Sequence, residues 1–403
     1  MGTAGRIHSV DDARRRAARS LPRPLFDYVD GGAEDEVTLR ANRSAFDRVT
    51  FRPRMGSGLA AATTATTVLG TPLSLPVVLA PAGLVRFVHP DGAQGAARGA
   101  ARGGTLSVLS TVAGTALEEV ADAVDGPRWF QLYSHGGPDH SAELVDRAGD
   151  AGYGALVVTL DTSALGNRER DVRHGVTQPL QLSVAGAARL AGHVAARPRW
   201  LVGTARALAR SRAGGSGPRP GSRGPHAPRA AVLTRPAPGG AGGRVVMERS
   251  PFSWEDVAAI RRRWSGPLLV KGVLTGADAA RAVEVGVDGV VVSNHGGRQL
   301  DGAPATLRVL PAVVEAVGGR AAVLLDGGVR RGSDVVKALA LGAQAVMVGR
   351  AFLYGLAAGG EDGVARVIEI LRSELERTLV LLGCPSVQDL DPSWIDLPGA
   401  APG

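Results

Sequence analysis

The sequence contains little of several features that would mark particular classes of protein. One cysteine, Cys384, excludes an internal disulfide and a cysteine-cluster metal site, and we predict no bound metal. The longest apolar stretch, 73–85, is broken by two prolines and is too short to span a bilayer. Aspartates and arginines precede any apolar stretch at the N-terminus, unlike a signal peptide. These absences predict a reducing, cytoplasmic compartment and no transmembrane helix.

Lysine is scarce, and acidic residues are missing from one long segment. Only Lys271 and Lys337 are lysines among 46 basic residues, so the other 44 are arginines. The 403-residue chain has a net charge of +8, and no Asp or Glu occurs between Val172 and Met247. That segment holds twelve arginines, so the remainder of the chain carries a net charge of −4. The positive charge therefore belongs to one region.

Three interpretations of segment 172–247 stay open. Residues 213–243 are rich in Gly, Pro, Ser and Ala and predict a flexible loop, whereas 180–209 could form one or two amphipathic helices. The segment could be a disordered insertion that merely reflects an arginine-rich proteome. It could instead be a basic patch that docks on an anionic membrane surface. Nucleic-acid binding is the third interpretation, but aromatic interleaving and a recognisable motif are missing, so we expect no nucleic-acid partner.

Eight short apolar segments alternate with helical patterns along the rest of the chain. The predicted strands are Val77–Ala80, Thr105–Leu109, Trp129–Gln131, Ala155–Val158, Leu268–Val270, Gly289–Val292, Ala322–Leu325 and Ala345–Val348. Helical patterns follow most of them, as at Ser141–Ala151, Ala277–Val285, Asp334–Leu341 and Val364–Leu382. Eight such repeats predict an α/β fold, a (β/α)8 TIM barrel.

The predicted barrel covers residues 61–403, with 172–247 as a basic, flexible insertion after the fourth strand. Residues 1–60 do not fit the repeat, and we predict that they form a helical N-terminal lid segment. Chemistry in such barrels takes place at the carboxyl ends of the strands, so the polar residues just after each strand are the candidates for the site.

The stretch SNHGGRQLD, Ser293 to Asp301, follows the sixth strand. His295 and Arg298 lie three residues apart in it, which offers a general base beside a guanidinium able to bind a carboxylate. After the fourth strand comes Asp161, a carboxylate that could orient and charge-stabilise this histidine. A structural histidine in a glycine-rich turn is the alternative for such a motif taken alone.

Glycine and arginine recur after the last two strands. DGGVR at Asp326–Arg330 and Gly349-Arg350 match the phosphate site that these barrels place after strands seven and eight, although two tight turns with surface arginines would have the same sequence. Lys271 follows the fifth strand, where its charge could stabilise negative charge on a cofactor. Further polar residues at strand ends are Ser110, Gln131, Tyr133 and Thr159.

These motifs together resemble the FMN-dependent 2-hydroxy-acid oxidising family. That family includes glycolate oxidase, lactate oxidase, lactate monooxygenase and the membrane-associated lactate and mandelate dehydrogenases. Besides SNHGGRQLD, the resemblance rests on four motifs, which are FDYVDGGAEDEVTLRAN at 26–42, WFQLY at 129–133, LLVKGV at 268–273 and DGGVRRGSDVVKALALGA at 326–343. It runs from about Phe26 to Asp389, except for the basic insertion.

The resemblance implies a role for each matching residue. His295 is the implied catalytic base, Asp161 its partner and Tyr133 a further catalytic residue. The substrate would be bound by Tyr28, Tyr133, Arg168 and Arg298. The FMN would be bound by Pro81, Ala82, Gly83, Ser110, Gln131, Thr159, Lys271, Ser293, Asp326, Gly328, Arg330, Gly349 and Arg350.

The implied reaction is FMN-dependent oxidation of an (S)-2-hydroxy acid to the 2-oxo acid. The base would take either the α-proton or the hydroxyl proton, and the sequence leaves both open. Oxidases of the family usually carry alanine where Gly83 falls, so the resemblance favours a dehydrogenase that passes electrons to oxygen only slowly. The acceptor could be oxygen, a quinone or another carrier. We also expect a homo-oligomer, cytoplasmic or peripheral to the inner face of the membrane.

Two alternative functions are retained. ARPRW at Ala196–Trp200 and the last third of the chain also resemble the pre-mycofactocin synthase branch, which oxidises a carbon bearing nitrogen on a modified peptide. That branch lacks an arginine at the position of Arg298, so a carboxylate substrate is favoured here. A non-catalytic, membrane-associated barrel is the alternative from another class. The joint presence of His295, Arg298, Lys271 and Arg168 argues against it.

Overall fold

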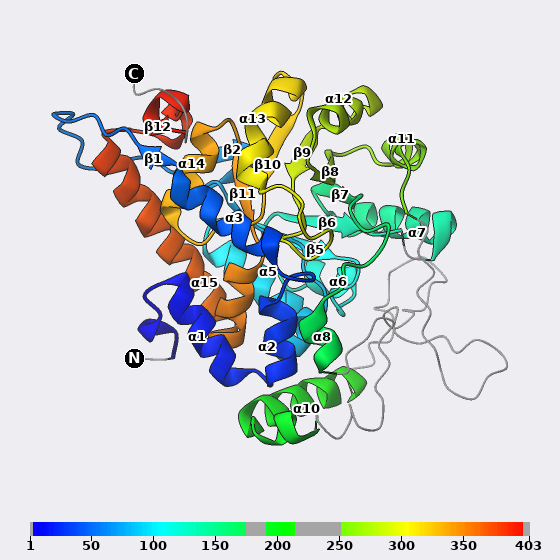
Figure 1. Cartoon of the computed structure of the whole chain (residues 1–403). Helices are drawn as coiled ribbons and strands as arrows, with labels where there is room; N and C mark the ends of the chain where they lie inside the picture. The colour runs from blue at the N-terminus through cyan, green and yellow to red at the C-terminus, as the bar shows by residue number, and fades with distance from the viewer. Residues whose placement is uncertain (1–2, 135, 175–190, 214–250, 398–403) are drawn as a thin grey trace.

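The computed structural model describes residues 3–134, 136–174, 191–213 and 251–397. Eight parallel strands close into a barrel in the order β10-β11-β4-β5-β6-β7-β8-β9. Their bounds are β4 Val77–Leu79, β5 Ser107–Ser110, β6 Arg128–Leu132, β7 Ala155–Thr159, β8 Leu268–Val273, β9 Gly289–Val292, β10 Ala322–Leu325 and β11 Ala345–Val348. The predicted barrel is confirmed, and all eight strands lie where the sequence placed them (Figure 1).

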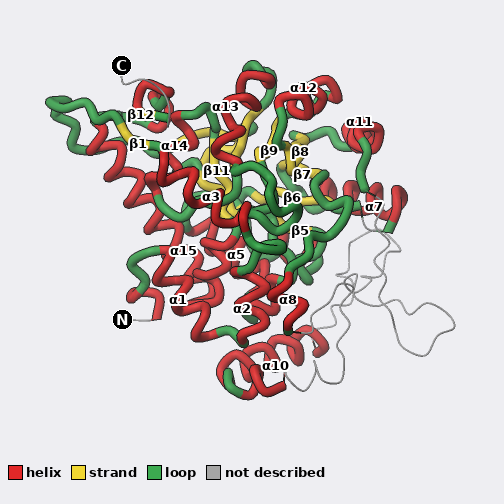
Figure 2. Tube along the Cα trace, viewed as in Figure 1, coloured by secondary structure: helices red, strands yellow, loops and turns green. Residues whose placement is uncertain are grey.

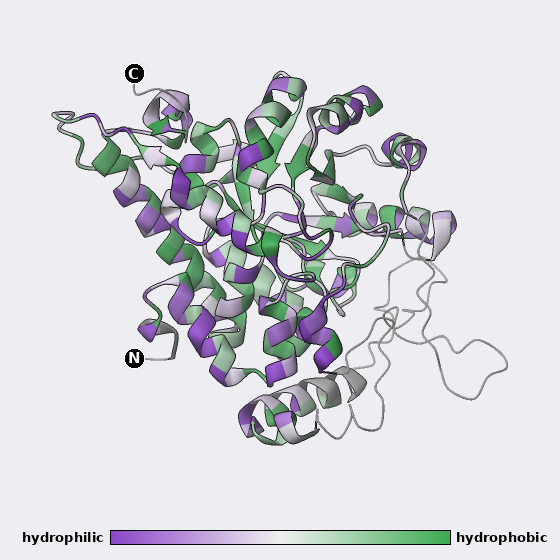
Figure 3. Ribbon diagram, in the orientation of Figure 1, coloured by the Kyte–Doolittle hydropathy of each residue, from purple (hydrophilic) through white to green (hydrophobic). Residues whose placement is uncertain are grey.

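Alternate residues of each strand face two different cores. Val78 and Met347 point into the barrel, where they join a buried cluster with Trp129. Val77 and Val348 point outward and join the larger cluster beneath the helices. Because both faces of the sheet are buried, the strands are mostly apolar, and β9, β10 and β11 carry apolar residues and glycine alone. The strands make up much of the green at the centre of Figure 3. Figure 2 shows the same strands enclosed by helices.

The covering helices follow the strands in the expected alternation. They are α4 Val85–Val88, α5 Gly92–Arg102, α6 Leu117–Ala121, α7 Gly137–Asp150, α11 Trp254–Arg263, α12 Gly276–Val285, α13 Thr306–Val317, α14 Gly332–Ala340 and α15 Arg350–Leu382. The predicted helix Val364–Leu382 is thus only the second part of α15. This helix begins directly after β11 and is kinked at Gly359 and Gly360, whose backbone angles are not helical.

A hairpin closes the amino end of the barrel. Strands β2, Thr66–Val68, and β3, Thr71–Leu73, pair in antiparallel register. Val68 and Leu73 are buried in the same cluster as the inward-facing barrel residues. The closed amino end leaves the opposite, carboxyl end as the place for a site.

The N-terminal segment reaches that carboxyl end. It contains η1 Thr3–Arg6, α1 Val10–Ser20, α2 Arg23–Asp30, α3 Val37–Arg48 and strand β1 Thr50–Phe51. The end of the described chain contains η2 Val387–Asp389, η3 Pro392–Trp394 and strand β12 Ile395–Asp396, and β12 pairs with β1. On α3, the amide of Asn42 exchanges two 2.8 Å hydrogen bonds with Asn294, which follows β9. The predicted helical character of this segment is therefore seen, with α3 held beside the loop that carries His295.

The start of the basic insertion is described in part. Helix α8 spans Glu169–Arg173 and helix α10 spans Pro198–Ala213, so part of the predicted amphipathic region is helical. The side chain of Trp200 donates a 3.0 Å hydrogen bond to the carbonyl of Phe87 on α4. The predicted flexible loop at 213–243 lies almost wholly outside the described residues. No helix in the described ranges is long and apolar enough to cross a membrane.

Candidate active site

The sequence-predicted site residues meet at the carboxyl end of the barrel. Those at or just after strand ends are Pro81, Ala82, Gly83, Ser110, Gln131, Tyr133, Thr159, Asp161, Lys271, Ser293, His295, Arg298, Asp326, Gly328, Arg330, Gly349 and Arg350. The other two come from helices, since Tyr28 lies on α2 and Arg168 is the N-cap of α8.

His295 and Asp161 form a hydrogen-bonded pair. The Nδ1 atom of His295 lies 2.9 Å from Oδ1 of Asp161, and both side chains are largely buried. The backbone of His295 is left-handed, with φ of +57°, a strained conformation that is common at functional sites. Gly272 makes room for the pair, because a Cβ at this position would lie 2.7 Å from that of Asp161. The carboxylate holds Nδ1 as the donor and leaves Nε2 as the acceptor.

The electrostatic surroundings keep this imidazole neutral. Burial lowers the pKa of His295 below its ordinary 6.5; Asp161 opposes that shift, while the charges of Lys271 and Arg168 add to it. Burial raises the pKa of Asp161, but the charges of His295 and Lys271 outweigh burial and lower it overall. At neutral pH the pair is therefore a neutral histidine beside a carboxylate, which is the arrangement of a general base.

Two tyrosines, Tyr133 and Tyr28, belong to the site and interact electrostatically with one another. The hydroxyl oxygen of Tyr133 is 3.4 Å from Nε2 of His295. Burial raises the pKa of Tyr133 to about 12, so its hydroxyl stays protonated and can donate a hydrogen bond. The hydroxyl of Tyr28 lies near Gly83, where a Cβ would come within 3.4 Å of it.

Two guanidinium groups share the site. Arg298 donates hydrogen bonds of 2.6 and 3.0 Å to the carbonyls of Tyr28 and Gly31, and its guanidinium lies 4.9 Å from the centroid of the Tyr28 ring. Arg168 is half-buried, and its buried Nε atom has no hydrogen-bond partner among the described residues. Burial, together with the charge of Arg298, lowers the pKa of Arg168 to about 10, so Arg168 remains cationic at neutral pH. Such a pair is suited to an anionic ligand.

Lys271 lies at the centre of a buried polar cluster. Its ammonium donates a 2.8 Å hydrogen bond to Ser293 and lies 3.2 Å from a carboxylate oxygen of Asp326. Burial lowers the pKa of Lys271, but the charges of Asp326 and Asp161 outweigh burial and raise it overall. A buried positive charge is thereby fixed at the mouth of the barrel.

Several buried polar atoms around this cluster are left without protein partners. The hydroxyl of Ser110 donates a 2.7 Å hydrogen bond to Oε1 of Gln131. The Nε2 atom of Gln131, Oγ1 of Thr159 and Oδ1 of Asp326 have no hydrogen-bond partner among the described residues. Buried polar atoms are usually paired, so three unpaired ones at the carboxyl ends of the barrel strands β6, β7 and β10 indicate a polar ligand.

The predicted phosphate loops differ from one another in how their arginines are used. Gly328 has φ of +91° and packs against the backbone of Asn42. Arg330 donates one side-chain hydrogen bond, to the carbonyl of Val329. Arg350 is buried and donates to the carbonyls of Val29, Gly31 and Gly296 at 2.8–3.1 Å. Three donors of Arg350 thus join the N-terminal segment to the His295 loop, a role that the sequence did not predict.

Two further residues support the site and were not predicted. Gln299 donates to the carbonyls of Asp161 and Ala164, and so fixes the loop that carries Asp161. Its position inside SNHGGRQLD was the signal that could have identified it. Arg170 forms ion pairs with Asp30 and Glu36, and no sequence motif marks it among 44 arginines.

Comparisons with known proteins agree with this geometry. The family model of FMN-dependent dehydrogenases matches residues 17–397. The chain belongs to this family. It is 40% identical over 387 residues to a peroxisomal (S)-2-hydroxyacid oxidase of Arabidopsis thaliana, which covers 95% of each chain. It is also 42% identical to the pre-mycofactocin synthase of Mycobacterium tuberculosis (strain ATCC 25618 / H37Rv), which covers 97% of this chain and 95% of the relative.

A solved structure of the same family has the same fold. The crystal structure of the monotopic membrane protein (S)-mandelate dehydrogenase superposes with a TM-score of 0.83 at 36% identity, covering 97% of this chain and 99% of that one. Membership of the FMN-dependent dehydrogenase family makes this protein an oxidoreductase with FMN as its cofactor. It also counts against a non-catalytic barrel.

The buried polar atoms of the site fit an FMN group. The unpaired atoms of Gln131 and Thr159 would bond the polar edge of the isoalloxazine ring, and Asp326 the ribityl chain. The fixed charge of Lys271 would stabilise negative charge on the reduced ring. The loops around Gly328 and Gly349 remain the predicted place for the phosphate.

Proposed function

We propose that this protein oxidises an (S)-2-hydroxy acid to the corresponding 2-oxo acid with bound FMN. The observation that carries the proposal is the half-buried guanidinium of Arg168 beside Arg298 and His295, because its buried Nε atom lacks a hydrogen-bond partner among the described residues. A substrate carboxylate would supply that partner, which places the 2-hydroxyl group near the base. The Arabidopsis relative is an (S)-2-hydroxyacid oxidase and the structural neighbour an (S)-mandelate dehydrogenase, and both support the same class of substrate.

The protein's own residues then bind, orient and exchange a proton with the substrate. Arg168 and Arg298 bind the carboxylate, and Tyr28 and Tyr133 donate hydrogen bonds to substrate oxygens. Nε2 of His295 accepts one proton, and the imidazolium that forms is stabilised by the carboxylate of Asp161. FMN, when bound, would supply the acceptor for the two electrons and for the second hydrogen that leaves the substrate.

The electron acceptor that regenerates the oxidised enzyme is proposed to be a quinone or another carrier rather than oxygen. Support comes from Gly83, in the loop after β4. A Cβ there would lie 3.1 Å from Cγ2 of Val112, so alanine, which oxidases usually carry, would fit only if that neighbour moved. The glycine is therefore part of how this loop packs, and the proposed enzyme is a dehydrogenase rather than a fast oxidase.

A comparison of an acid with its amide tests the substrate class. The protein is mixed anaerobically with (S)-2-hydroxy acids and with the corresponding 2-hydroxy amides, and loss of the flavin absorbance is followed. The proposal predicts much faster reduction by the acid, because the neutral amide cannot form charge-assisted hydrogen bonds to two guanidiniums. Equal rates would contradict it. They would favour the peptide or amine substrate suggested by the 42% identical pre-mycofactocin synthase.

Docking on an anionic membrane surface is proposed for the basic segment 172–247. On α10, Leu201 and Val202 are more than two-fifths exposed, and Arg197 and Arg199 lie just before them. Apolar and cationic side chains in such proximity suit the interface of an anionic bilayer. The structural neighbour is itself a monotopic membrane protein. Cosedimentation with phosphatidylglycerol vesicles at low salt is expected, and its absence would reject this part of the proposal.

Cytoplasmic location and assembly into a homo-oligomer complete the proposal. A single cysteine suits a reducing compartment, and homo-oligomers are common among soluble enzymes. Light scattering of the purified protein gives the mass in solution. A mass equal to the 41.3 kDa of one chain would contradict the homo-oligomer.

A further inference from the structure

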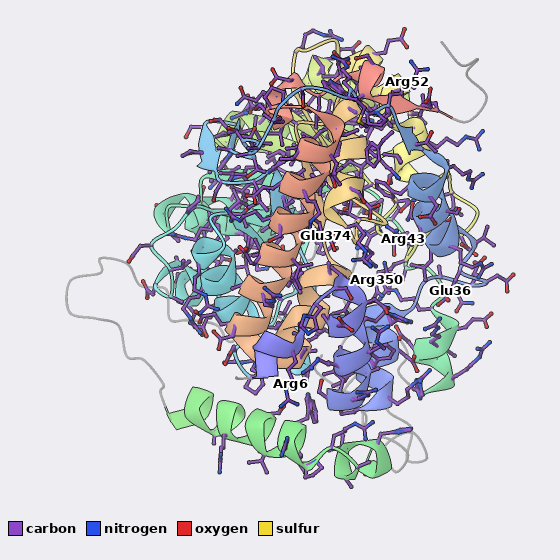
Figure 4. The ribbon with its side chains drawn as sticks, turned by 90° about the vertical axis from the view of Figure 1, so that its left-hand side faces the viewer. Arg6, Glu36, Arg43, Arg52, Arg350 and Glu374 are labelled. Carbon is purple, nitrogen blue, oxygen red and sulfur yellow. The ribbon has the colours of Figure 1, made fainter. Side chains whose placement is uncertain are left out.

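One arginine of α8, Arg170, pairs with carboxylates of the N-terminal segment, most closely with Asp30 and Glu36 and at 3.7 Å with Oδ1 of Asp27. Nη1 of Arg170 lies 3.1 Å from Oδ2 of Asp30, and its Nη2 lies 2.6 Å from Oε2 of Glu36. The stem of Arg170 passes over Gly31, where a Cβ would lie 3.2 Å from its Cδ. Figure 4 shows Glu36 next to α8, the short green helix beneath it. The guanidinium thus fastens α8 to both ends of the turn between α2 and α3.

That turn contacts the guanidinium of Arg298 and the backbone next to Arg168. On one side, Arg298 donates to the carbonyls of Tyr28 and Gly31. On the other, the N–H of Glu34 donates a 2.7 Å hydrogen bond to the carbonyl of Asn167, the residue before Arg168. The turn is therefore the structural connection between the two arginines that would bind the carboxylate.

The position of α8 also determines the position of Arg168. The carbonyl of Arg168 accepts the N–H groups of Asp171 and Val172 at 2.9 and 3.1 Å, so this residue is the first rigid point of the helix. A five-residue helix has little stability of its own and depends on contacts with its surroundings. The bridge made by Arg170 is one such contact.

The carboxylates that receive the bridge are themselves fixed. Asp30 is buried and is held by Arg14 through bonds of 2.6 and 2.9 Å and by the hydroxyl of Tyr354 at 2.7 Å. Oε1 of Glu36 accepts the N–H of Gly32 at 2.9 Å, which leaves Oε2 for Arg170. Because these two carboxylates are themselves held in place, their ion pairs with Arg170 fix α8 relative to α2 and α3, which a mobile surface ion pair would not do.

We infer that Arg170 is a positioning residue for the proposed reaction, because its bridge between Asp30 and Glu36 sets the separation of Arg168 and Arg298 and hence the affinity for the substrate carboxylate. This inference rests on the proposed function of the two arginines. Arg170 itself touches no substrate. Its loss should therefore weaken carboxylate binding while the proton transfer at His295 continues.

A set of four variants tests the inference on the FMN-loaded protein. They are R170Q, R170K, E36Q and the matched control R173Q. Arg173 is an exposed arginine on α8, and it pairs with Glu169 within that helix rather than with the N-terminal segment. The probe is oxalate, a small dicarboxylate, and its binding is read from the perturbed flavin absorption spectrum. KM and kcat with the best 2-hydroxy acid are measured alongside.

R170Q is expected to raise both the oxalate Kd and KM about tenfold while kcat changes less than about twofold, since small displacements of a binding group are enough for such losses. R170K should recover part of the affinity, because one ammonium can pair with one carboxylate but cannot bridge two. E36Q should show a smaller loss, because the amide oxygen can still accept the N–H of Gly32. R173Q should match the parent.

Unchanged oxalate binding in FMN-loaded R170Q would overturn the inference, as would an equal loss in R173Q. If R170Q does not retain FMN, the oxalate affinity of E36Q is the test instead. An oxalate Kd for E36Q equal to that of the parent would overturn the inference. Failure of the proposed function has a different signature, in which the parent protein itself binds no oxalate and is reduced by no 2-hydroxy acid.

Discussion

Nδ1 of His295 lies 2.9 Å from Oδ1 of Asp161, and the opposite nitrogen of the same ring lies 3.4 Å from the hydroxyl of Tyr133. The contact with Asp161 selects the tautomer that leaves Nε2 as an acceptor, directed toward the proposed substrate. The base is therefore prepared before any ligand binds.

Replacing this carboxylate should remove most of the turnover. In D161N the amide can present its NH2 group to Nδ1, which selects the wrong tautomer, and the charge that stabilises the imidazolium is lost. We expect kcat to fall by about 10²–10⁴-fold with FMN content unchanged, as measured by steady-state kinetics. The control is D150N, at an exposed aspartate that ends α7. Activity of D161N within a few-fold of the parent would remove Asp161 from the proposed catalytic pair.

The activity should rise with pH through the titration of His295. Because burial lowers the pKa of His295 below 6.5, the imidazole becomes a base at pH values beneath that figure, and kcat/KM should level off above it. Asp161 raises this pKa, so residual activity of D161N should titrate at a still lower pH. A pH profile with its midpoint above 6.5 in the parent would disagree with the environment seen around the ring.

Loss of Lys271 should destabilise the fold as well as the site. In K271M the carboxylate of Asp326, buried and 3.2 Å from the ammonium, loses its ion-pair partner. Breaking a buried pair costs about 3–5 kcal/mol, so the urea midpoint of the FMN-loaded variant should fall. The double variant K271M/D326N should recover part of the loss, because it removes the unpaired charge. A single variant as stable as the parent would show that this pair is not a significant contributor.

Gly83 should limit the reaction of the reduced enzyme with oxygen. In G83A the new Cβ would lie 3.1 Å from Cγ2 of Val112, so Val112 or the loop must shift to make room for it. We expect the flavin colour of the anaerobically reduced variant to return in air roughly tenfold faster, a barrier change of about 1.4 kcal/mol. Stopped-flow absorbance measures this rate. An unchanged rate of reoxidation in G83A would show that Gly83 does not determine how fast the reduced flavin reacts with oxygen.

The barrel was predictable because hydrophobic patterning is local and strong. Three predicted strands, Gly289–Val292, Ala322–Leu325 and Ala345–Val348, have the same bounds in the structure. Buried parallel strands are apolar on both faces, so the sequence records them directly. The same reasoning located the site, since every strand end with a polar residue had to lie on one face of the barrel.

Connections between distant side chains were not predictable in this way. Arg350 was expected to bind a phosphate, yet its guanidinium donates to the carbonyls of Val29 and Gly31, more than 300 residues away. The bridge of Arg170 to Glu36 likewise joins residues 134 positions apart. In a chain with 44 arginines, nothing local distinguishes an arginine that fastens two elements from one that faces solvent.

Anaerobic reduction of the bound flavin is the strictest test of whether this protein oxidises (S)-2-hydroxy acids. The FMN-loaded protein is mixed without oxygen with a panel of 2-hydroxy acids, each as separate (S) and (R) enantiomers, and its visible absorbance is recorded before and after air is admitted. The account predicts rapid bleaching by at least one (S)-2-hydroxy acid, little by its (R) enantiomer, and slow return of colour in air. An FMN-loaded protein that no 2-hydroxy acid bleaches would contradict it.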